Sequence, residues 1–309
     1  MKIVIAGGSG FLGSALIEAL RARGDEIVVL SRRVAQARPV AQAFRPAVAW
    51  TPDGTTGPWA REIDGAGAVI NLAGEPMPDK RWTAAQKERI LQSRVLATRS
   101  LVAAARAASQ PPPAFISGSG VDFYPDSDEI VDETSPAGTG FLSRVCLAWE
   151  AEAREAERSG CRVVLLRTGV VLHRDGGALP KLLTPFRFGA GGPLGSGRQW
   201  WPWIHRDDWV RMTLWAVDTA AVRGPLNVCA PEPARYREIA NAIGRALRRP
   251  SFMPAPAFAL RILLGEMAEM LLTSKRAVPA RARELGFTWR FPELDAAVSD
   301  AVTPRTARR

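Results

Sequence analysis

The sequence has few of the residues that build metal and disulfide sites. Among its 309 residues are three cysteines and two histidines. Cys146, Cys161 and Cys229 are far apart and form no C-x-x-C pair, which argues against a disulfide framework and a cysteine-based zinc site. Two histidines are too few for a metal centre built on imidazole ligands. The sequence therefore predicts a protein without a bound metal.

Lysine is also scarce, although the chain is basic. The formal net charge is +10, but only five of the 41 basic residues are lysines, so arginine carries nearly all the positive charge. A nucleic-acid-binding protein gathers its basic residues on one face, with aromatic residues between them. These arginines are instead spread along the chain and mixed with Glu. We therefore expect no nucleic-acid partner, and a positive field that attracts anionic cofactors and small anionic substrates.

Uninterrupted apolar runs of membrane-spanning length are absent too. The segment 257–272, AFALRILLGEMAEMLL, is interrupted by Arg261, Glu266 and Glu269, so we expect no membrane span. It predicts a helix that packs on a second domain or forms a subunit interface, which leaves a homo-oligomer open. The first residues, KIVIAGG, indicate a buried strand running into a turn rather than a signal peptide. Together with the few cysteines, this favours a reducing cytoplasm as the compartment.

Strand and helix patterns alternate through about the first 170 residues. The helical patterns cover residues 11–24, 82–108 and 138–158. The apolar strand patterns cover residues 2–7, 26–33, 47–50, 67–74, 111–120 and 161–172. This alternation predicts an α/β fold, a doubly wound parallel sheet with helices on both faces.

A glycine-rich turn joins the first strand to the first helix. In GGSGFLG (7–13), Gly7 permits a tight turn, Gly10 lets the backbone approach a pyrophosphate, and Gly13 lets the helix pack on the strand. The helix N-terminus then offers free N–H groups to the phosphates. In this βαβ context the triplet predicts a dinucleotide site in a Rossmann fold. The predicted contacts are Gly7, Ser9, Gly10, Phe11 and Leu12.

The end of the second strand predicts which nicotinamide cofactor binds. An NAD site usually has an Asp or Glu there for the ribose 2′-hydroxyl, whereas this strand ends Leu30-Ser31-Arg32-Arg33. Two guanidinium groups suit a 2′-phosphate. We therefore predict that NADP(H) is the cofactor. The alternative is that both arginines are surface residues that contact only solvent.

The other strand ends predict the remaining cofactor contacts, because the carboxyl ends of parallel strands meet at one edge of the sheet. The predicted contacts are Trp50, Thr51, Leu72, Ala73, Gly74, Glu75, Ser117 and Val170. Arg81 and Arg94 are further candidates for phosphate or loop contacts.

After about residue 170 the pattern changes. A Gly- and Trp-rich loop at 189–203 precedes a helix at 206–218, a strand at 224–230 and a helix at 235–248. The expected dinucleotide-binding domain comprises residues 1–168 and 204–230, and the smaller α/β substrate domain comprises 169–203 and 231–309. We expect the substrate in the cleft between them.

Several motifs resemble the extended short-chain dehydrogenase/reductase superfamily. GGSGFLG is similar to its G-x-x-G-F-[IL]-G turn, NLAG (71–74) to its fourth-strand motif, and RTGVVL (167–172) to its sixth strand. More closely, NLAGE, ERILQSRVLAT (88–98), the SGSGVDFYPD loop and FLSRVCLAWE (141–150) resemble an atypical subgroup. Its members are described as sugar-nucleotide epimerases with a C-terminal domain of unknown function. The resemblance covers the whole chain and implies fold and cofactor rather than substrate.

The resemblance also implies a catalytic Ser or Thr, a Tyr, and a Lys four residues after the Tyr. In FLSRVCLAWE, alignment on Glu150 places Leu142 at the Tyr position and Cys146 at the Lys position. The only two tyrosines, Tyr124 and Tyr236, are not followed by a Lys four residues later. The usual Tyr-x-x-x-Lys pair is therefore missing.

Other polar groups could take over the chemistry. Tyr124 could act as an acid if it is desolvated, and Ser119 could hold a substrate oxygen. Alternatively, both side chains only bond the loop backbone. Trp200, Trp201 and Trp203 could roof a substrate pocket, or could simply pack the small domain.

Two functions stay open on these observations. The first is an NADP(H)-dependent oxidoreductase or epimerase-like enzyme with Tyr124 and Ser119 as its catalytic groups and a small molecule, unidentified, as its substrate. The second is a non-catalytic NADP(H)-binding protein that reports the state of the cofactor to a partner.

Overall fold

The computed structural model describes residues 1–32, 47–77 and 80–303, and it centres on a seven-stranded sheet. The strands, in order across the sheet, are β3 (Val48–Ala49), β2 (Glu26–Ser31), β1 (Lys2–Ala6), β4 (Ala68–Asn71), β5 (Ala114–Gly120), β7 (Arg162–Thr168) and β11 (Gly224–Val228). The order reverses between β1 and β4, which is where a doubly wound sheet binds ligands. The parallel doubly wound sheet predicted from the sequence is confirmed.

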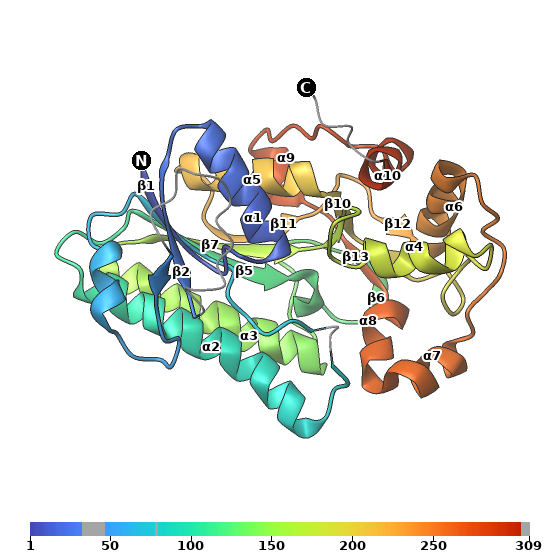
Figure 1. The fold of residues 1–309 in the computed structure, drawn as a ribbon, viewed down its shortest axis with the longest axis horizontal. Coiled ribbons are helices and arrows are strands. Elements are labelled where there is room, and N and C mark those ends of the chain that lie inside the picture. The colour runs from blue at the N-terminus through green and yellow to red at the C-terminus, as the bar shows by residue number, and fades with distance from the viewer. Residues whose placement is uncertain (33–46, 78–79, 304–309) are drawn as a thin grey trace. The chain divides into compact units, whose positions relative to one another are not determined.

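Helices cover both faces of this sheet. On one side lie α2 (Ala84–Ala107) and α3 (Phe141–Arg154), and α1 (Phe11–Ala22) lies on the other (Figure 1). Burial on both faces explains why β1 reads as a continuous apolar run, with Ile3, Val4 and Ile5 fully buried. The register pairs Ile5 with Ile70 of β4, so large aliphatic side chains lie side by side in the core.

The chain folds into two compact units. The first comprises Met1–Phe123, Thr139–Arg167 and Thr213–Leu226, and the second comprises Tyr124–Gly138, Thr168–Met212 and Asn227–Arg309. Relative to the boundaries predicted from the sequence, residues 124–138, 168, 204–212 and 227–230 lie in the second unit. Strand pairing is the reason, because β6 (Ser127–Val131) pairs with β13 (Lys275–Ala277) and β10 (Trp203–His205) pairs with β8 (Val170–Leu172).

The second unit is built from short strands and helices. Its remaining strands, β9 (Trp200–Trp201) and β12 (Ala234–Arg235), pair antiparallel. Its helical elements are α4 (Leu179–Arg187), α6 (Tyr236–Leu247), α7 (Ala257–Leu264), η5 (Gly265–Ala268), α8 (Glu269–Leu272), α9 (Ala280–Glu284) and α10 (Leu294–Val302). Phe186, Trp201, Trp203 and Tyr236 fill its core. Helix α5 (Arg206–Asp218) runs from this unit into the first.

Two strand and helix predictions need correction. The predicted strand 161–172 is divided into β7 and β8 around Gly169, whose amide donates to the carbonyl of Val228 at 3.0 Å. The predicted helix 257–272 is divided into α7, η5 and α8, because Gly265 takes a φ of +62° that ends α7. Both interruptions are at glycines, where the backbone is least restricted.

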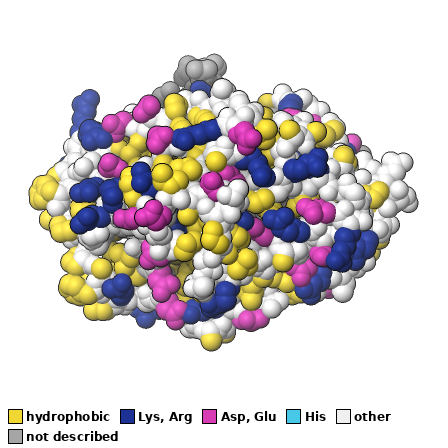
Figure 2. Space-filling view, turned by 180° about the vertical axis from the view of Figure 1, so that it is seen from behind, with side chains coloured by type: hydrophobic (Ala, Val, Ile, Leu, Met, Phe, Trp, Pro, Cys, Tyr) yellow, Lys and Arg dark blue, Asp and Glu magenta, His cyan; other side chains and the backbone are white. Residues whose placement is uncertain are grey.

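The surface charge agrees with the dispersed arginines of the sequence. Figure 2 shows Lys and Arg side chains scattered over one face and interspersed with Asp and Glu. Within the described ranges, we find no helix with the length and apolar character needed to cross a bilayer.

Candidate functional site

The glycine turn is packed so closely that side chains are excluded from it. Gly7 has a φ of +83°, and a Cβ there would lie 2.6 Å from the carbonyl carbon and oxygen of Leu72. A Cβ on Gly13 would lie 2.4 Å from the carbonyl oxygen of Gly7. The amide of Gly10 donates to that same oxygen at 3.1 Å and closes the turn. The turn therefore needs glycine at both ends, as the sequence pattern predicts.

The N-terminus of α1 is open to a ligand. Gly10 is its N-cap residue, no side chain caps the helix, and its first turn has no acidic residue. Ser9 and Gly10 are exposed, and Phe11 and Leu12 are half-buried. The N–H groups of the first turn have no acceptor within the helix, and together with the positive end of a 12-residue helix they form an anion site. These residues fit a pyrophosphate.

The residues beyond β2 lie partly within the described chain. Arg32 directly follows β2 and is exposed, whereas Arg33 lies outside the described residues. Trp50 is buried, with its ring edge-on to Trp59 at a centroid distance of 5.4 Å, and Thr51 is exposed. In the sequence, no Asp or Glu occurs between Ser31 at the end of β2 and Asp53.

The loop after β4, residues 72–75, is held to α2 by hydrogen bonds. Asn71 is fully buried and donates to Thr98 at 2.8 Å, while its side-chain oxygen accepts from the amide of Ala73 at 3.1 Å. The amide of Glu75 donates to Ser93 at 2.9 Å. Since Leu72 also packs against Gly7, this loop lies directly beside the glycine turn, and we call the two together with the N-terminus of α1 the cradle.

The other predicted cofactor contacts lie in different places. Ser117 is buried in β5 and its hydroxyl donates to the carbonyl of Gly118 at 3.2 Å. Arg81 is exposed just before α2. Val170 belongs to the second unit, where β8 pairs it with Trp203.

Helix α3 has no proton donor at the positions where the superfamily has Tyr and Lys. Leu142 is half-buried and Cys146 is buried, with its sulfur 3.7 Å from the carbonyl oxygen of Gly120. Burial, with the nearby Asp122 and Glu150 carboxylates, raises the pKa of Cys146 to about 12. At neutral pH this thiol stays protonated and is a poor acid, base or nucleophile.

Ser119 belongs to a buried ionic cluster that the sequence analysis missed. Its hydroxyl donates to the Oε1 of Glu150 at 2.7 Å. Arg167 of β7 donates two hydrogen bonds to the same carboxylate, from Nε at 2.8 Å and from Nη2 at 2.9 Å. The guanidinium also lies over the Phe123 ring, 3.4 Å from its centroid. A partial signal existed for Arg167, which directly follows four apolar residues of a buried strand, whereas Glu150 is one of four charged residues in α3 and does not stand out.

Tyr124 lies in the second unit and is 1% exposed. Its hydroxyl donates to the side-chain oxygen of Asn227 at 2.7 Å. Asn227 in turn donates its backbone amide to Glu133 at 2.9 Å and its side-chain amide to the carbonyl of Val278 at 2.8 Å. Burial raises the pKa of Glu133 above its ordinary value. Tyr124 is thus held by a buried chain of hydrogen bonds.

The tryptophans pack within the second unit. Trp201 lies edge-on to Tyr236 at 4.7 Å between centroids, and Trp203 is buried. Trp200 is half-buried, and two guanidinium groups lie over its ring. The guanidinium carbons of Arg235 and Arg276 are 4.4 Å and 4.5 Å from the ring centroid. These contacts agree with the alternative in which the tryptophans pack the small domain rather than roof a substrate pocket.

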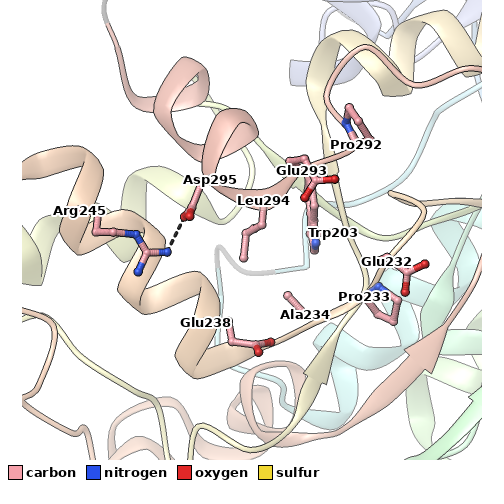
Figure 3. Close-up of a pocket in the computed structure, with 10 residues that line it drawn as sticks. All are labelled: Trp203, Glu232, Pro233, Ala234, Glu238, Arg245, Pro292, Glu293, Leu294 and Asp295. Atoms are coloured by element: carbon pink, nitrogen blue, oxygen red, sulfur yellow. Dashed lines mark hydrogen bonds and ion pairs between the residues drawn. The ribbon is translucent and has the colours of Figure 1, made fainter.

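A cavity of about 380 Å³ lies in the same unit (Figure 3). Its lining includes the acids Glu232, Glu238, Glu293 and Asp295, together with Trp203 and Arg245. Arg245 is ion-paired to Asp295, so the remaining charge on the wall is negative. Such a wall repels phosphate, which excludes this cavity as the cofactor site.

Comparison with known families divides the chain in two. Residues 3–229 match the NAD dependent epimerase/dehydratase family, and residues 255–301 match a domain of unknown function, DUF1731. The subgroup predicted from the sequence, with its C-terminal domain of unknown function, is confirmed.

Individual relatives match over nearly the full length. The epimerase family protein SDR39U1 of Bos taurus is 39% identical over 98% of this chain and 100% of its own. The crystal structure of human SDR39U1 (isoform 2) with NADPH is 36% identical, covers 97% of this chain and 99% of its own, and has a TM-score of 0.88. The nucleoside-diphosphate sugar epimerase of Corynebacterium glutamicum is 31% identical over 97% of this chain and 58% of its own, with a TM-score of 0.76.

Proposed function

This chain belongs to the NAD-dependent epimerase/dehydratase family, and we propose that it is an NADP(H)-dependent, epimerase-like oxidoreductase that lacks the usual Tyr-x-x-x-Lys pair. The observation that carries the proposal is the cradle formed by Gly7, the N-terminus of α1 and the loop after β4. The NADPH in the crystal structure of human SDR39U1 supports the choice of cofactor.

Each part of the cradle has a role in binding. The free N–H groups at the start of α1 hold the pyrophosphate, and the glycine turn brings the backbone close to it. Arg32 and Arg33 take the 2′-phosphate, because guanidinium groups form paired hydrogen bonds with phosphate oxygens. Bound NADP(H) supplies hydride chemistry at its nicotinamide ring.

Proton handling is assigned to Tyr124 and Ser119. The Ser119 hydroxyl already donates its proton to Glu150, so its oxygen is left to accept a hydrogen bond from a substrate hydroxyl. The Tyr124 hydroxyl, whose proton is donated to the side-chain oxygen of Asn227, is the acid once it turns from Asn227 to the substrate. Its buried position excludes water, and a positioned acid of this kind speeds proton transfer.

We expect NADPH to bind at least about tenfold more tightly than NADH, about 1.4 kcal/mol. The reason is the Arg32–Arg33 pair, and the change Arg32→Ala plus Arg33→Ala should remove most of the difference. Calorimetric titration of the two cofactors measures it. As a charge-matched control, Arg61→Ala plus Arg158→Ala removes two exposed arginines that precede β4 and β7, away from the carboxyl ends of the strands. Equal affinities in the wild type would refute the assignment.

With a substrate in hand, Tyr124→Phe should lower kcat by about tenfold or more while NADPH affinity stays unchanged. Cys146→Ala should change kcat little, because a buried thiol with a pKa of about 12 takes no part in proton transfer. Steady-state turnover and cofactor titration of both variants test this. The opposite pattern, a large loss with Cys146→Ala alone, would return the chemistry to α3.

One observation favours the second function, a non-catalytic NADP(H) sensor. Helix α3 presents Leu142 and a high-pKa Cys146 where proton-transferring groups belong. The two functions are separated by following the absorbance of NADPH in the presence of panels of carbonyl substrates and sugar nucleotides. Tight binding of NADPH with no oxidation by any of them favours the sensor.

A further inference from the structure

A buried guanidinium lies beside the cradle. The Glu75 carboxylate acts on it electrostatically but, among the described residues, no carboxylate makes an ion pair with it. Arg94 of α2 is 7% exposed. Its Nη1 donates to the carbonyl oxygens of Glu75, at 3.1 Å, and Ile90, at 3.0 Å. Among the described residues, Nε and Nη2 form no hydrogen bond and no carboxylate lies within ion-pair distance of the group. Three of its five N–H donors are therefore left for another acceptor.

The surroundings of Arg94 place it at the carboxyl ends of β4 and β5. On one side lies Gly74, where a Cβ would be 3.0 Å from the guanidinium carbon. On the other lies the Trp149 ring, with its centroid 5.2 Å from that carbon. Trp149 in turn packs on the end of β5, since a Cβ on Gly118 would be 2.8 Å from its ring. Arg94 is thus fixed between the loop after β4 and the end of β5.

A charge in this position is costly unless a ligand uses it. Removing a charged group from water without a counter-charge is strongly unfavourable, and burial lowers the pKa of Arg94 from its ordinary 12.5. The group still stays protonated at neutral pH. Holding a helix to a loop requires only neutral donors, such as the Ser93 hydroxyl already present there. The N–H donors that the described residues leave unused therefore indicate a ligand with hydrogen-bond acceptors.

The sheet order shows which part of the cofactor reaches Arg94. A dinucleotide crosses the sheet at the reversal between β1 and β4, with its pyrophosphate on the glycine turn. Arg32, after β2, lies on the adenosine side. The nicotinamide half therefore extends over β4 and β5, which is where Arg94 lies.

We propose that Arg94 binds the ribose hydroxyls of the nicotinamide half of NADP(H), and so supplies from α2 the fixed cation that α3 lacks at Cys146. This assignment rests on the proposed NADP(H) function. The planar guanidinium suits two neighbouring hydroxyl oxygens, because its donors point in parallel.

Two probes separate this role from a structural one. NADPH contains the nicotinamide ribose, whereas adenosine 2′,5′-bisphosphate contains only the adenosine half with its 2′-phosphate. Arg94→Met should weaken NADPH binding by at least about tenfold and leave adenosine 2′,5′-bisphosphate binding unchanged. Arg94→Lys, which keeps the charge but loses the paired donors, should fall between. Arg89→Met is the control, because Arg89 is exposed on the same helix and, among the described residues, hydrogen-bonds only to Gln86.

Calorimetric titration gives distinct outcomes. Equal weakening of both probes would mean that Arg94 only holds the loop, and unchanged NADPH affinity would mean that it does not touch the cofactor; either result overturns the assignment. If Arg94→Met does not fold, the same comparison is made with Arg94→Lys. Failure of the wild-type protein to bind NADPH would instead overturn the proposed function itself.

Discussion

Replacing Gly7 with alanine will weaken NADPH binding by at least about thirtyfold, corresponding to about 2–5 kcal/mol. The added Cβ would lie 2.6 Å from the Leu72 carbonyl, which is backbone and cannot rotate away. Overpacking of this kind costs about 1–3 kcal/mol, and the φ of +83° adds about 1–2 kcal/mol for a residue with a Cβ. The turn or the loop after β4 must shift, and either shift opens the cradle.

The chain offers a matched control for this prediction. Gly24, beyond the other end of α1, has the same φ of +83°, but a Cβ there would meet nothing within 4 Å. Gly24→Ala therefore introduces the same backbone strain without the clash. We expect it to lower the free energy of unfolding slightly and to leave the NADPH dissociation constant unchanged. Similar cofactor affinities for the two variants would show that the close approach at Gly7 does not matter.

Removing the Glu150 carboxylate will lower the free energy of unfolding of the first unit by about 3–5 kcal/mol. Glu150 and Arg167 are almost completely buried, with side chains 4% and 3% exposed. Glu150→Met leaves the guanidinium charged in the core without the carboxylate that it binds, and it deprives Ser119 of its acceptor. Urea denaturation measures the loss.

Two further variants isolate the cause of that loss. Glu150→Met combined with Arg167→Met removes both charges, and it should restore stability to within about 1 kcal/mol of the wild type because no charge stays buried. Arg99 of α2 and Glu152 of α3 form another ion pair, whose side chains are 50% and 21% exposed. Glu152→Met should therefore lower the free energy of unfolding by less than about 1 kcal/mol. A double variant as unstable as the single one would show that packing, not charge, is responsible.

The cofactor half of the site was predictable because local sequence determines it. A strand, three spaced glycines and a helix follow one another within 22 residues, and the structure gives a steric reason for the first and the last of these glycines, Gly7 and Gly13. The continuous apolar runs of β1, β2 and β4 were equally readable, since strands buried on both faces need apolar side chains throughout.

The remaining features depend on contacts between distant segments. Strand β6 reads SDEIV, with three exposed residues at its centre, and nothing in that pattern indicates its partner β13. Arg167 is a charge in a buried, otherwise apolar part of β7, and its partner Glu150 is identified only by the structure. Arg94 likewise needs the positions of Gly74 and Trp149 before its environment is apparent. Spacing along the chain contains no information on such pairings.

The pairing of β6 with β13 has a consequence for synthesis on the ribosome. The amide of Ser274 donates to Asp126, and that of Arg281 to Glu133, each across 148 residues of chain. At roughly 5–20 residues per second, translation takes roughly 7–30 s to supply these partners. The last segment of the first unit ends at Leu226, so a nascent chain can complete that unit while β6 still lacks its neighbour. During this interval Asp126, Asp128 and Glu129 protect the open strand edge, because charged side chains discourage pairing with a second nascent chain.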